Sequence, residues 1–497
     1  MKCPIKTIKN ISKLLKILLD LKGGCKMKLD LAVINGTAYV NGKFKSVDIG
    51  IKDEKFVMIT EPGFLPDAKQ IIDAKDKYVI PGGIDTHVHF RDPGHSERGT
   101  FYTESQAAVA GGTTTILEHP ISMPPQYNKE ILDNRKKIAK ERAGVVDYAF
   151  YGAAGGEFPE EIVGLAKEGI VAFKTFLHEA PEGRDREFVG LTMANDYEIL
   201  IGMKEVAKTG LMLASHAENN DMIQGIIKKF RSEGKVSAEY HCPSRPPIAE
   251  YITVQKLITI AEKTGCVLEL AHISTPEAMQ MAKEAKERNQ KIFLETCPHY
   301  LLLTEEELMK HGPYAKCNPP LRNKETVDKI WDYVLDGTVD FIGSDHGPFL
   351  AEEKDIGYED IFKAPAGMIG IDLRLPLMLN EVAKGERGIT LEQVVQLCCE
   401  NPAKAFNIYP QKGTIQPGSD GDLVILDMND KMIIDSKNNY SHSREIAKVY
   451  DGWELNCKLN YTIIRGKTVM EDGIVDPIGS GTKGWGKLVL SQPKKVK

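Results

Sequence analysis

The sequence predicts an α/β fold in which eight parallel strands and their connecting helices close into a barrel. Eight apolar segments of strand length recur between residues 78 and 345. The stretches between them, such as KEILDNRKKIAKERAG and TVQKLITIAEKTG, have helical periodicity and often end in glycine. Eight strands close a parallel barrel, and polar side chains fall at the strand ends, where such barrels build active sites. The segments are YVIPGGIDTHVHF, TTTILEH, VVDYAFYGA, IVAFKTFL, LMLASH, CVLELAH, IFLETC and VDFIGSD.

Alternating residues on both sides of this region predict a second, smaller domain. Between residues 27 and 78, runs such as LDLAVINGTAYV and VDIGIKDEKFVMI are punctuated by glycine and asparagine, which indicates short antiparallel strands. The same alternating pattern occurs again between residues 406 and 475, in GDLVILDM, KMIID and LNYTIIRGKTVMEDG. We therefore expect these segments to be the two halves of one β domain, with the barrel spanning residues 79–405.

The two ends of the chain differ from the rest. Residues 1–26 contain KTIKNISKLLKILLDLKGG, which predicts a basic amphipathic helix before a second methionine at Met27. Three interpretations stay open: a helix on a membrane surface, a helix packed on the protein, or a start assigned too far upstream. Lysines interrupt every apolar stretch here, so we expect no secretory signal and no membrane-spanning segment. Residues 476–497 are rich in glycine, proline and lysine, which predicts an extended tail.

Composition narrows the class of partner. Hydrophobic residues make up 42% of the 497 residues, enough for a large core, and the formal net charge is -6. Without a cluster of basic residues in the body of the chain, nucleic acid is not an expected partner, whereas a small molecule is. Nine cysteines lack the paired spacing of a structural zinc site, so we expect reduced thiols and a cytoplasmic protein.

Six metal-binding side chains follow apolar, strand-like runs. In IDTHVHF the two histidines are two residues apart, so a strand would project both from one face toward one ion. A single histidine on such a strand is more often a buried core residue than a ligand, but packing alone rarely places a whole set at strand ends. The set has ligands enough for two metal ions and predicts a metal-dependent hydrolase; its members are His87, His89, Lys174, His216, His272 and Asp345.

Several motifs resemble the cyclic amidohydrolases, the group of allantoinases, dihydropyrimidinases, hydantoinases and dihydroorotases. The motifs are HVHFRDPG, FKTFL, SHAEN, AHISTPE, ETCPHYLLL, KCNPPLR and SDHGPF, and the resemblance covers residues 27–475. It implies a distorted (β/α)8 TIM barrel with a composite β-sandwich, a two-metal centre bridged by a carboxylated lysine, and hydrolytic opening of a ring amide. It also implies a homo-oligomer, either a dimer or a tetramer.

Carried onto this chain, the resemblance assigns each ligand. His87, His89 and Asp345 would hold one ion, His216 and His272 the other, and Lys174, as its carbamate, would bridge both. Zinc is the first expectation, although manganese, iron and cobalt suit the same ligands. A hydroxide bridging the metals would then attack the ring carbonyl, and Asp345 would pass its proton to the departing nitrogen. The alternative for Lys174 is a surface lysine whose stem lies along neighbouring phenylalanines.

The substrate is less strongly indicated, and allantoin leads. Arg91 matches a dihydroorotase pattern in which arginine binds the substrate carboxylate, but EHPISMPP lacks the Met-Pro-Asn stretch of those enzymes. FLHEAPEG lacks the tyrosine loop of dihydropyrimidinases and hydantoinases, which remain alternatives together with dihydroorotase. Arg91 could instead pair with Asp92 or Glu97. Asn318 would hydrogen-bond the ring amide or merely shape a turn.

Three further histidines and one rival class complete the expectations. His299 and His346 would either orient ligands or serve as buried structural residues, and His119 is not assigned to the site. A non-catalytic scaffold related to dihydropyrimidinase is the rival from another class, but such a scaffold has no reason to retain all six ligands. A deacetylase or deaminase on the same barrel is a further alternative.

Overall fold

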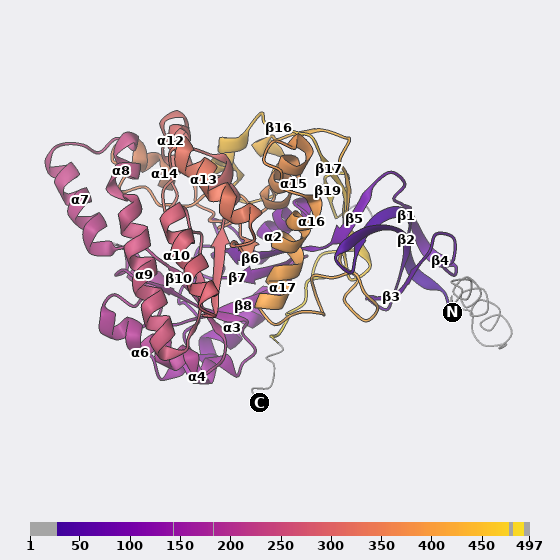
Figure 1. Cartoon of the computed structure of the whole chain (residues 1–497), viewed down its shortest axis with the longest axis horizontal. Helices are drawn as coiled ribbons and strands as arrows, with labels where there is room; N and C mark the ends of the chain where they lie inside the picture. The colour runs from indigo at the N-terminus through magenta and orange to yellow at the C-terminus, as the bar shows by residue number, and fades with distance from the viewer. Residues whose placement is uncertain (1–26, 143, 182, 477–480, 492–497) are drawn as a thin grey trace, which may run out of the picture.

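The computed structural model describes residues 27–142, 144–181, 183–476 and 481–491. The amphipathic helix expected within residues 1–26 lies outside the described residues, as do parts of the expected tail. Two bodies lie side by side along the long axis in Figure 1: a mixed body of helices and strands, and a smaller body of strands.

Eight parallel strands form the sheet of the larger body. Their order in the sheet is their order in the chain, from β6 to β13, and every neighbouring pair is parallel. A bridge between Val88 and His346 brings the last segment beside the first, so the barrel is nearly closed and the prediction is confirmed. The strands are β6 Gly83–Val88, β7 Thr113–Glu118, β8 Asp147–Ala153, β9 Ala172–Phe176, β10 Met212–His216, β11 Val267–Leu270, β12 Ile292–Thr296 and β13 Phe341–Ile342.

Helices connect the strands and cover the barrel. Four of them begin at an asparagine whose side chain accepts a backbone N–H of the first turn, namely α3, α6, α7 and α13, and α9 and α15 end at a left-handed glycine. The longer helices are α2 Phe101–Ala110, α3 Lys129–Glu141, α6 Asp196–Ala207, α7 Asn220–Ser232, α9 Pro247–Thr264, α10 Pro276–Glu287, α13 Lys324–Leu335 and α15 Arg374–Lys384. The shorter helices are α4 Glu161–Ala166, α5 Asp185–Phe188, α8 His241–Ser244, α11 Pro298–Leu302, α12 Glu305–His311, α14 Ala351–Asp355, α16 Leu391–Val395 and α17 Asn401–Ala405.

The smaller body is one sheet built from both ends of the chain, as predicted. Its order is β19-β18-β17-β14-β5-β1-β2-β3, with β4 paired to β1, and the antiparallel pair of β5 and β14 joins the two halves. The strands are β1 Leu29–Val40, β2 Lys43–Lys52, β3 Lys55–Thr60, β4 Ala68–Asp73, β5 Tyr78–Pro81, β14 Leu423–Asp427, β17 Lys458–Ile464, β18 Lys467–Glu471 and β19 Ile474–Val475. A small separate ribbon pairs β15 Met432–Ile433 with β16 Glu454–Leu455.

One expected strand is divided between the two bodies. YVIPGGIDTHVHF reads as a single apolar run, but β5 hydrogen-bonds to β1 and β14 in the smaller sheet, and β6 begins the barrel. Gly82 lies at the change of sheet, where a Cβ would come within 2.1 Å of the Thr114 hydroxyl oxygen. Both parts are buried, so hydrophobicity alone could not locate the change.

A buried charged cluster joins the two bodies. The Lys412 ammonium lies 2.9 Å from an Asp420 oxygen and 2.7 Å from an Asp422 oxygen, and it also donates to Asp147 of β8. Arg465, which directly follows β17, donates to the other oxygen of Asp147. Burial disfavours the Lys412 charge, but the three carboxylates together raise its pKa. We call these five residues the junction cluster.

Two further expectations concern membranes and thiols. Across the parts of the chain that the structure describes, no helix combines the length and the apolar character needed to cross a bilayer. The seven cysteines in those parts are all free thiols.

Candidate metal centre

The six expected ligands come together at the C-terminal end of the barrel. His87 lies in β6, Lys174 in β9, and His216 is the last residue of β10. His89, His272 and Asp345 follow β6, β11 and β13 within three residues. Five of the six line a cavity of about 880 Å³, and Lys174 is fully buried. The strand-end positions of the sequence prediction therefore meet at one site.

Three ligand atoms converge on one point. Nε2 of His87 and Nε2 of His89 lie 3.4 and 3.3 Å from the same oxygen of Asp345. Ligands bound to one ion at about 2.0–2.2 Å are separated by about this distance in a tetrahedral arrangement. Both histidine nitrogens therefore lie as far from this carboxylate oxygen as ligands that share one divalent ion with it would lie.

A second pair of ligands converges beside the first. Nδ1 of His216 lies 3.1 Å from Nε2 of His272, and the ring centroids are 4.8 Å apart. When both nitrogens are deprotonated, this separation matches that of two ligands on one ion. The donor set therefore fits two ions rather than one.

Buried polar atoms without partners mark the same place. Nζ of Lys174 and Nδ1 of both His89 and His272 have no hydrogen-bond partner among the described residues. Burial lowers the pKa of Lys174, although the carboxylates of Asp345 and Glu295 oppose this. A buried ammonium without a hydrogen bond is costly, so this lysine fits a site completed by further groups. Its position also excludes the surface-lysine alternative.

Two glutamates support the ligands, and the sequence analysis missed both. Oε1 of Glu295 lies 2.7 Å from Nδ1 of His87, and Oε2 of Glu218 lies 2.8 Å from Nε2 of His216. Arg245 in turn donates to Glu218. Each contact fixes which imidazole nitrogen carries the proton and which can bind a metal. The available signals were an acidic residue inside the apolar run IFLETC and another two residues after His216.

The pKa values of the carboxyl groups at the centre are shifted in different directions. Burial raises the pKa of Asp345 to about 7 against the attraction of Lys174, and it raises that of Glu295 to about 7 as well. Burial would also raise the pKa of Glu218, but Arg245 and His216 lower it to about 2. Bound cations would favour the ionised form of every one of these groups.

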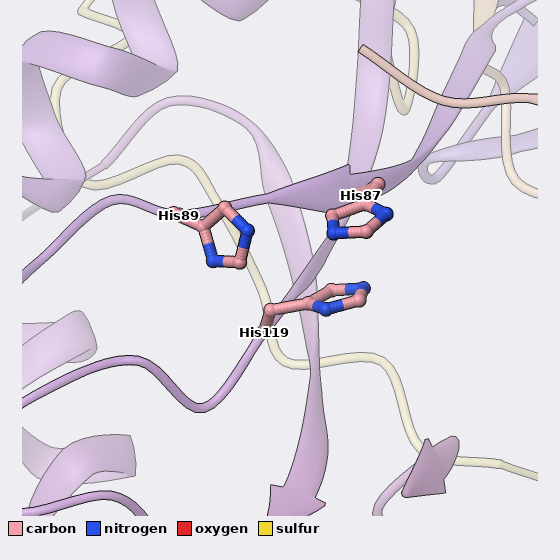
Figure 2. A group of neighbouring side chains, drawn as sticks. All are labelled: His87, His89 and His119. Atoms are coloured by element: carbon pink, nitrogen blue, oxygen red, sulfur yellow. The ribbon is translucent and has the colours of Figure 1, made fainter. Parts of the chain in front are cut away.

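His119, which was not assigned to the site, lies against the first group of ligands. Figure 2 shows the rings of His119 and His87 face to face. Their centroids are 3.8 Å apart, and their planes differ by 11°. Ligand atoms of His87, His89 and His119 all lie within 4.8 Å of one another. Nε2 of His119 is 3.1 Å from the carbonyl of Thr86, and Nδ1 has no partner in the described part of the chain. His119 is therefore a neighbour of the centre that sequence spacing did not reveal.

Three residues of the site have a left-handed backbone. The φ angles are +62° at Arg91, +42° at His272 and +48° at Asp345. Side chains other than glycine rarely adopt this region, and such strained positions cluster at functional sites. The left-handed backbone turns the chain sharply after each strand, where the side chain enters the cavity.

Arg91 is buried beside the centre, and only part of its guanidinium is accounted for by contacts within the described chain. Its Nη1 lies 3.7 Å from Glu187, its Nε and Nη1 have no hydrogen-bond partner among the residues described, and its guanidinium lies 4.9 Å from the Phe349 ring centroid. Burial and the nearby charge of Arg184 lower its pKa to about 9. The expected alternative pairing is wrong, because Asp92 pairs with Arg142 and Glu97 pairs with His95.

Asn318 lines the cavity, and its side-chain oxygen is buried without a partner in the described chain. The flanking carbonyls of Cys317 and Pro319 accept hydrogen bonds from His241 and from the Tyr300 hydroxyl. The loop is therefore held from both sides while the amide faces the cavity.

The two remaining histidines differ in their contacts. His346 lies 2.9 Å from a Glu104 oxygen, and Ser441 also donates to that oxygen. Both contacts lie away from the ligand atoms. His299 is buried, which lowers its pKa to about 3, and its Nε2 has no partner among the described residues.

Comparison with known proteins places this geometry in a family. The family model "Amidohydrolase family" matches residues 78–469. An L-hydantoinase of Paenarthrobacter aurescens is 35% identical over 451 residues, which are 90% of this chain and 95% of that protein. An allantoinase of Rubrobacter xylanophilus is 34% identical over 447 residues, with coverage of 90% and 95%.

Solved structures give the same result. The L-hydantoinase (dihydropyrimidinase) from Arthrobacter aurescens has a TM-score of 0.87 at 32% identity and covers 93% of this chain and 100% of its own. The dihydropyrimidinase from Brevibacillus agri has a TM-score of 0.84 at 29% identity, with coverage of 93% and 99%. The chain therefore belongs to the amidohydrolase family.

Proposed function

We propose that this protein hydrolyses a ring amide of a small cyclic substrate, with allantoin opened to allantoate as the leading reaction. The convergence of five expected ligands at one cavity, together with the fully buried Lys174, carries the proposal. Several similar proteins are named allantoinase, including those of Rubrobacter xylanophilus and Solibacter usitatus.

The donor set suits two divalent ions, with zinc as the first candidate. One ion would be held by His87, His89 and Asp345, the other by His216 and His272, and Lys174 carboxylated by carbon dioxide would bind both. Such ions supply a polarised substrate carbonyl and a water molecule of lowered pKa.

The chain's own residues would then handle the proton and the ring. Water adds to the ring carbonyl carbon, the carbon–nitrogen bond breaks, and one water proton reaches the departing nitrogen. Asp345 would carry that proton, because its side chain lines the cavity. The Asn318 oxygen would accept a ring N–H, and the free donors of Arg91 would bind an oxygen of the substrate.

A specific observation favours a second candidate, dihydroorotate. The Arg91 guanidinium has unused donors and shares Glu187 with Arg184, so a substrate carboxylate would suit it better than a neutral ureide. The hydantoinases among the similar proteins support hydantoin or dihydrouracil as further candidates.

Initial rates of ring opening decide between these substrates. Protein loaded with zinc and bicarbonate is assayed against allantoin, dihydroorotate, dihydrouracil and hydantoin at matched concentrations. Highest kcat/KM on allantoin supports the leading reaction, and preference for dihydroorotate makes Arg91 a carboxylate ligand. Bound metal with no turnover on any of the four contradicts all four candidates, and failure to bind metal supports the non-catalytic scaffold.

Two further parts of the proposal concern the protein's state. We propose a homodimer or homotetramer in the cytoplasm, supported by the family resemblance and by seven free thiols in the described chain. Light scattering coupled to size-exclusion chromatography measures the mass, and a monomer would contradict the oligomer.

A further inference from the structure

We propose that Glu295 is a positioning residue that ties the ligands of both ions together, so that its removal weakens the binding of both. The inference rests on the two-ion centre of the proposed function. Glu295 itself contacts no expected ion position in this arrangement, because its carboxylate is used by protein donors.

The contacts of Glu295 reach both groups of ligands. Oε1 lies 2.7 Å from Nδ1 of His87, a ligand of the first ion, and 3.1 Å from the backbone nitrogen of His272, a ligand of the second. Oε2 accepts the Thr86 hydroxyl at 2.6 Å. The donors come from β6 and from the segment after β11, and Glu295 itself lies in β12.

The surrounding atoms restrict the carboxylate of Glu295 to one position. Glu295 is 0% exposed. A Cβ on Gly343 would lie 2.6 Å from Oε2 and 2.9 Å from the Cβ of His87, so only glycine lets the chain after β13 pass this close. The barrel strands therefore hold Glu295 at one position between the two groups of ligands.

Each contact has a separate consequence for metal binding. Donation from Nδ1 of His87 fixes the tautomer whose Nε2 lone pair faces Asp345. The bond to the His272 backbone holds a residue with a left-handed φ of +42°, and so directs Nε2 of His272 toward His216. One carboxylate thus orients one ligand of each ion.

Glu218 provides a matched comparison. It contacts only one of the six ligands, His216, and Arg245 supports it from the cavity wall. Replacing it should affect the second ion alone. A bridging Lys174 would couple the two ions equally in both variants, so a difference between the variants reports the contacts of Glu295.

The experiment titrates metal-free full-length wild type, Glu295→Gln, Glu295→Ala and Glu218→Gln with zinc in bicarbonate buffer against a fluorescent chelator. Bound zinc per chain is confirmed by mass spectrometry. Outer carboxylates of this kind typically contribute about 10–100-fold to metal affinity. We expect Glu295→Gln to weaken both binding steps by that factor, Glu295→Ala to weaken both further, and Glu218→Gln to weaken one step.

The outcomes separate this inference from the proposed function. Two tightly bound zinc ions in wild type, with Glu295→Gln weakening one step or neither, would overturn the inference and leave the function intact. Fewer than two ions in wild type would overturn both. Glu295→Gln nearly preserves shape, so it decides the matter if Glu295→Ala does not fold, and circular dichroism of each metal-free variant controls for folding.

Discussion

The metal centre and the junction cluster are both buried and charged, but the lysine at the heart of each differs in its partners. In the junction cluster, Lys412 is 2% exposed and contacts three carboxylates. In the centre, Lys174 is 0% exposed, and its ammonium has no hydrogen-bond partner in the described chain. Unpaired buried charge is costly, so a fold retains it only where something else compensates. We therefore expect the junction cluster to contribute to the stability of the fold, and the centre to be completed by bound ligands.

Replacing Asp345 should give the largest effect. Asp345→Asn keeps the shape of the side chain but cannot accept the proton, so turnover should fall by about 10²–10⁴-fold. Zinc content should stay close to that of wild type, because a carboxamide oxygen still faces His87 and His89. Steady-state kinetics and metal analysis on the same sample measure both. Asp336→Asn, on the surface before β13, is the control and should keep full activity; wild-type turnover in Asp345→Asn would remove its catalytic role.

Lys412→Met tests the junction. It leaves buried carboxylates without their cation, and breaking a buried pair in this way costs about 3–5 kcal/mol. Urea denaturation of metal-free protein measures the loss. Because the pKa of Lys412 is raised, its contribution should be fully present from neutral pH up to the unfolded value of about 10.4 and be lost only in stronger alkali.

The exposed Lys487, at the same junction, supplies the control for that experiment. It pairs with Glu54 at the surface, so Lys487→Met should cost no more than about 1 kcal/mol. If Lys412→Met and Lys487→Met lost the same free energy of unfolding, the burial and pairing of Lys412 would not determine how much the junction cluster stabilises the protein.

Binding of metal at the centre should raise the free energy of unfolding of the protein. Zinc at about 100 times its dissociation constant should add about 2.7 kcal/mol for each independent ion. Urea denaturation with and without zinc and bicarbonate measures this, and a chelator should reverse it. An unchanged midpoint would mean that the five strand ends do not bind metal in the folded state.

The same contrast explains what the sequence could predict. Strand periodicity and apolar runs depend on neighbouring residues, so they located the barrel strands and placed the expected ligands at their ends. The contact between His87 and Glu295 joins residues 208 positions apart, and it depends on which strands meet across the barrel. The pairing of Arg91 with Glu187 depends on where the short helix α5 lies, and the junction cluster depends on how two bodies pack. No local pattern carries these pairings.

Lys174→Met should change the free energy of unfolding by less than Lys412→Met, and in the opposite direction. Without metal or bicarbonate, the substitution removes a buried ammonium that lacks a hydrogen bond, which costs about 1–3 kcal/mol in comparable cases. We therefore expect metal-free Lys174→Met to be more stable than metal-free wild type by up to that amount, while zinc binding is lost.

Denaturation of both methionine variants under identical metal-free conditions provides the measurement. If Lys174→Met were destabilised as strongly as Lys412→Met, the Lys174 ammonium would be satisfied in the folded protein. The unpaired atoms of the centre would then not mark a missing ligand. If the free energy of unfolding falls in Lys412→Met and rises in Lys174→Met, then Lys412 is retained for the fold. Lys174 is then retained for the reaction, at a cost to stability.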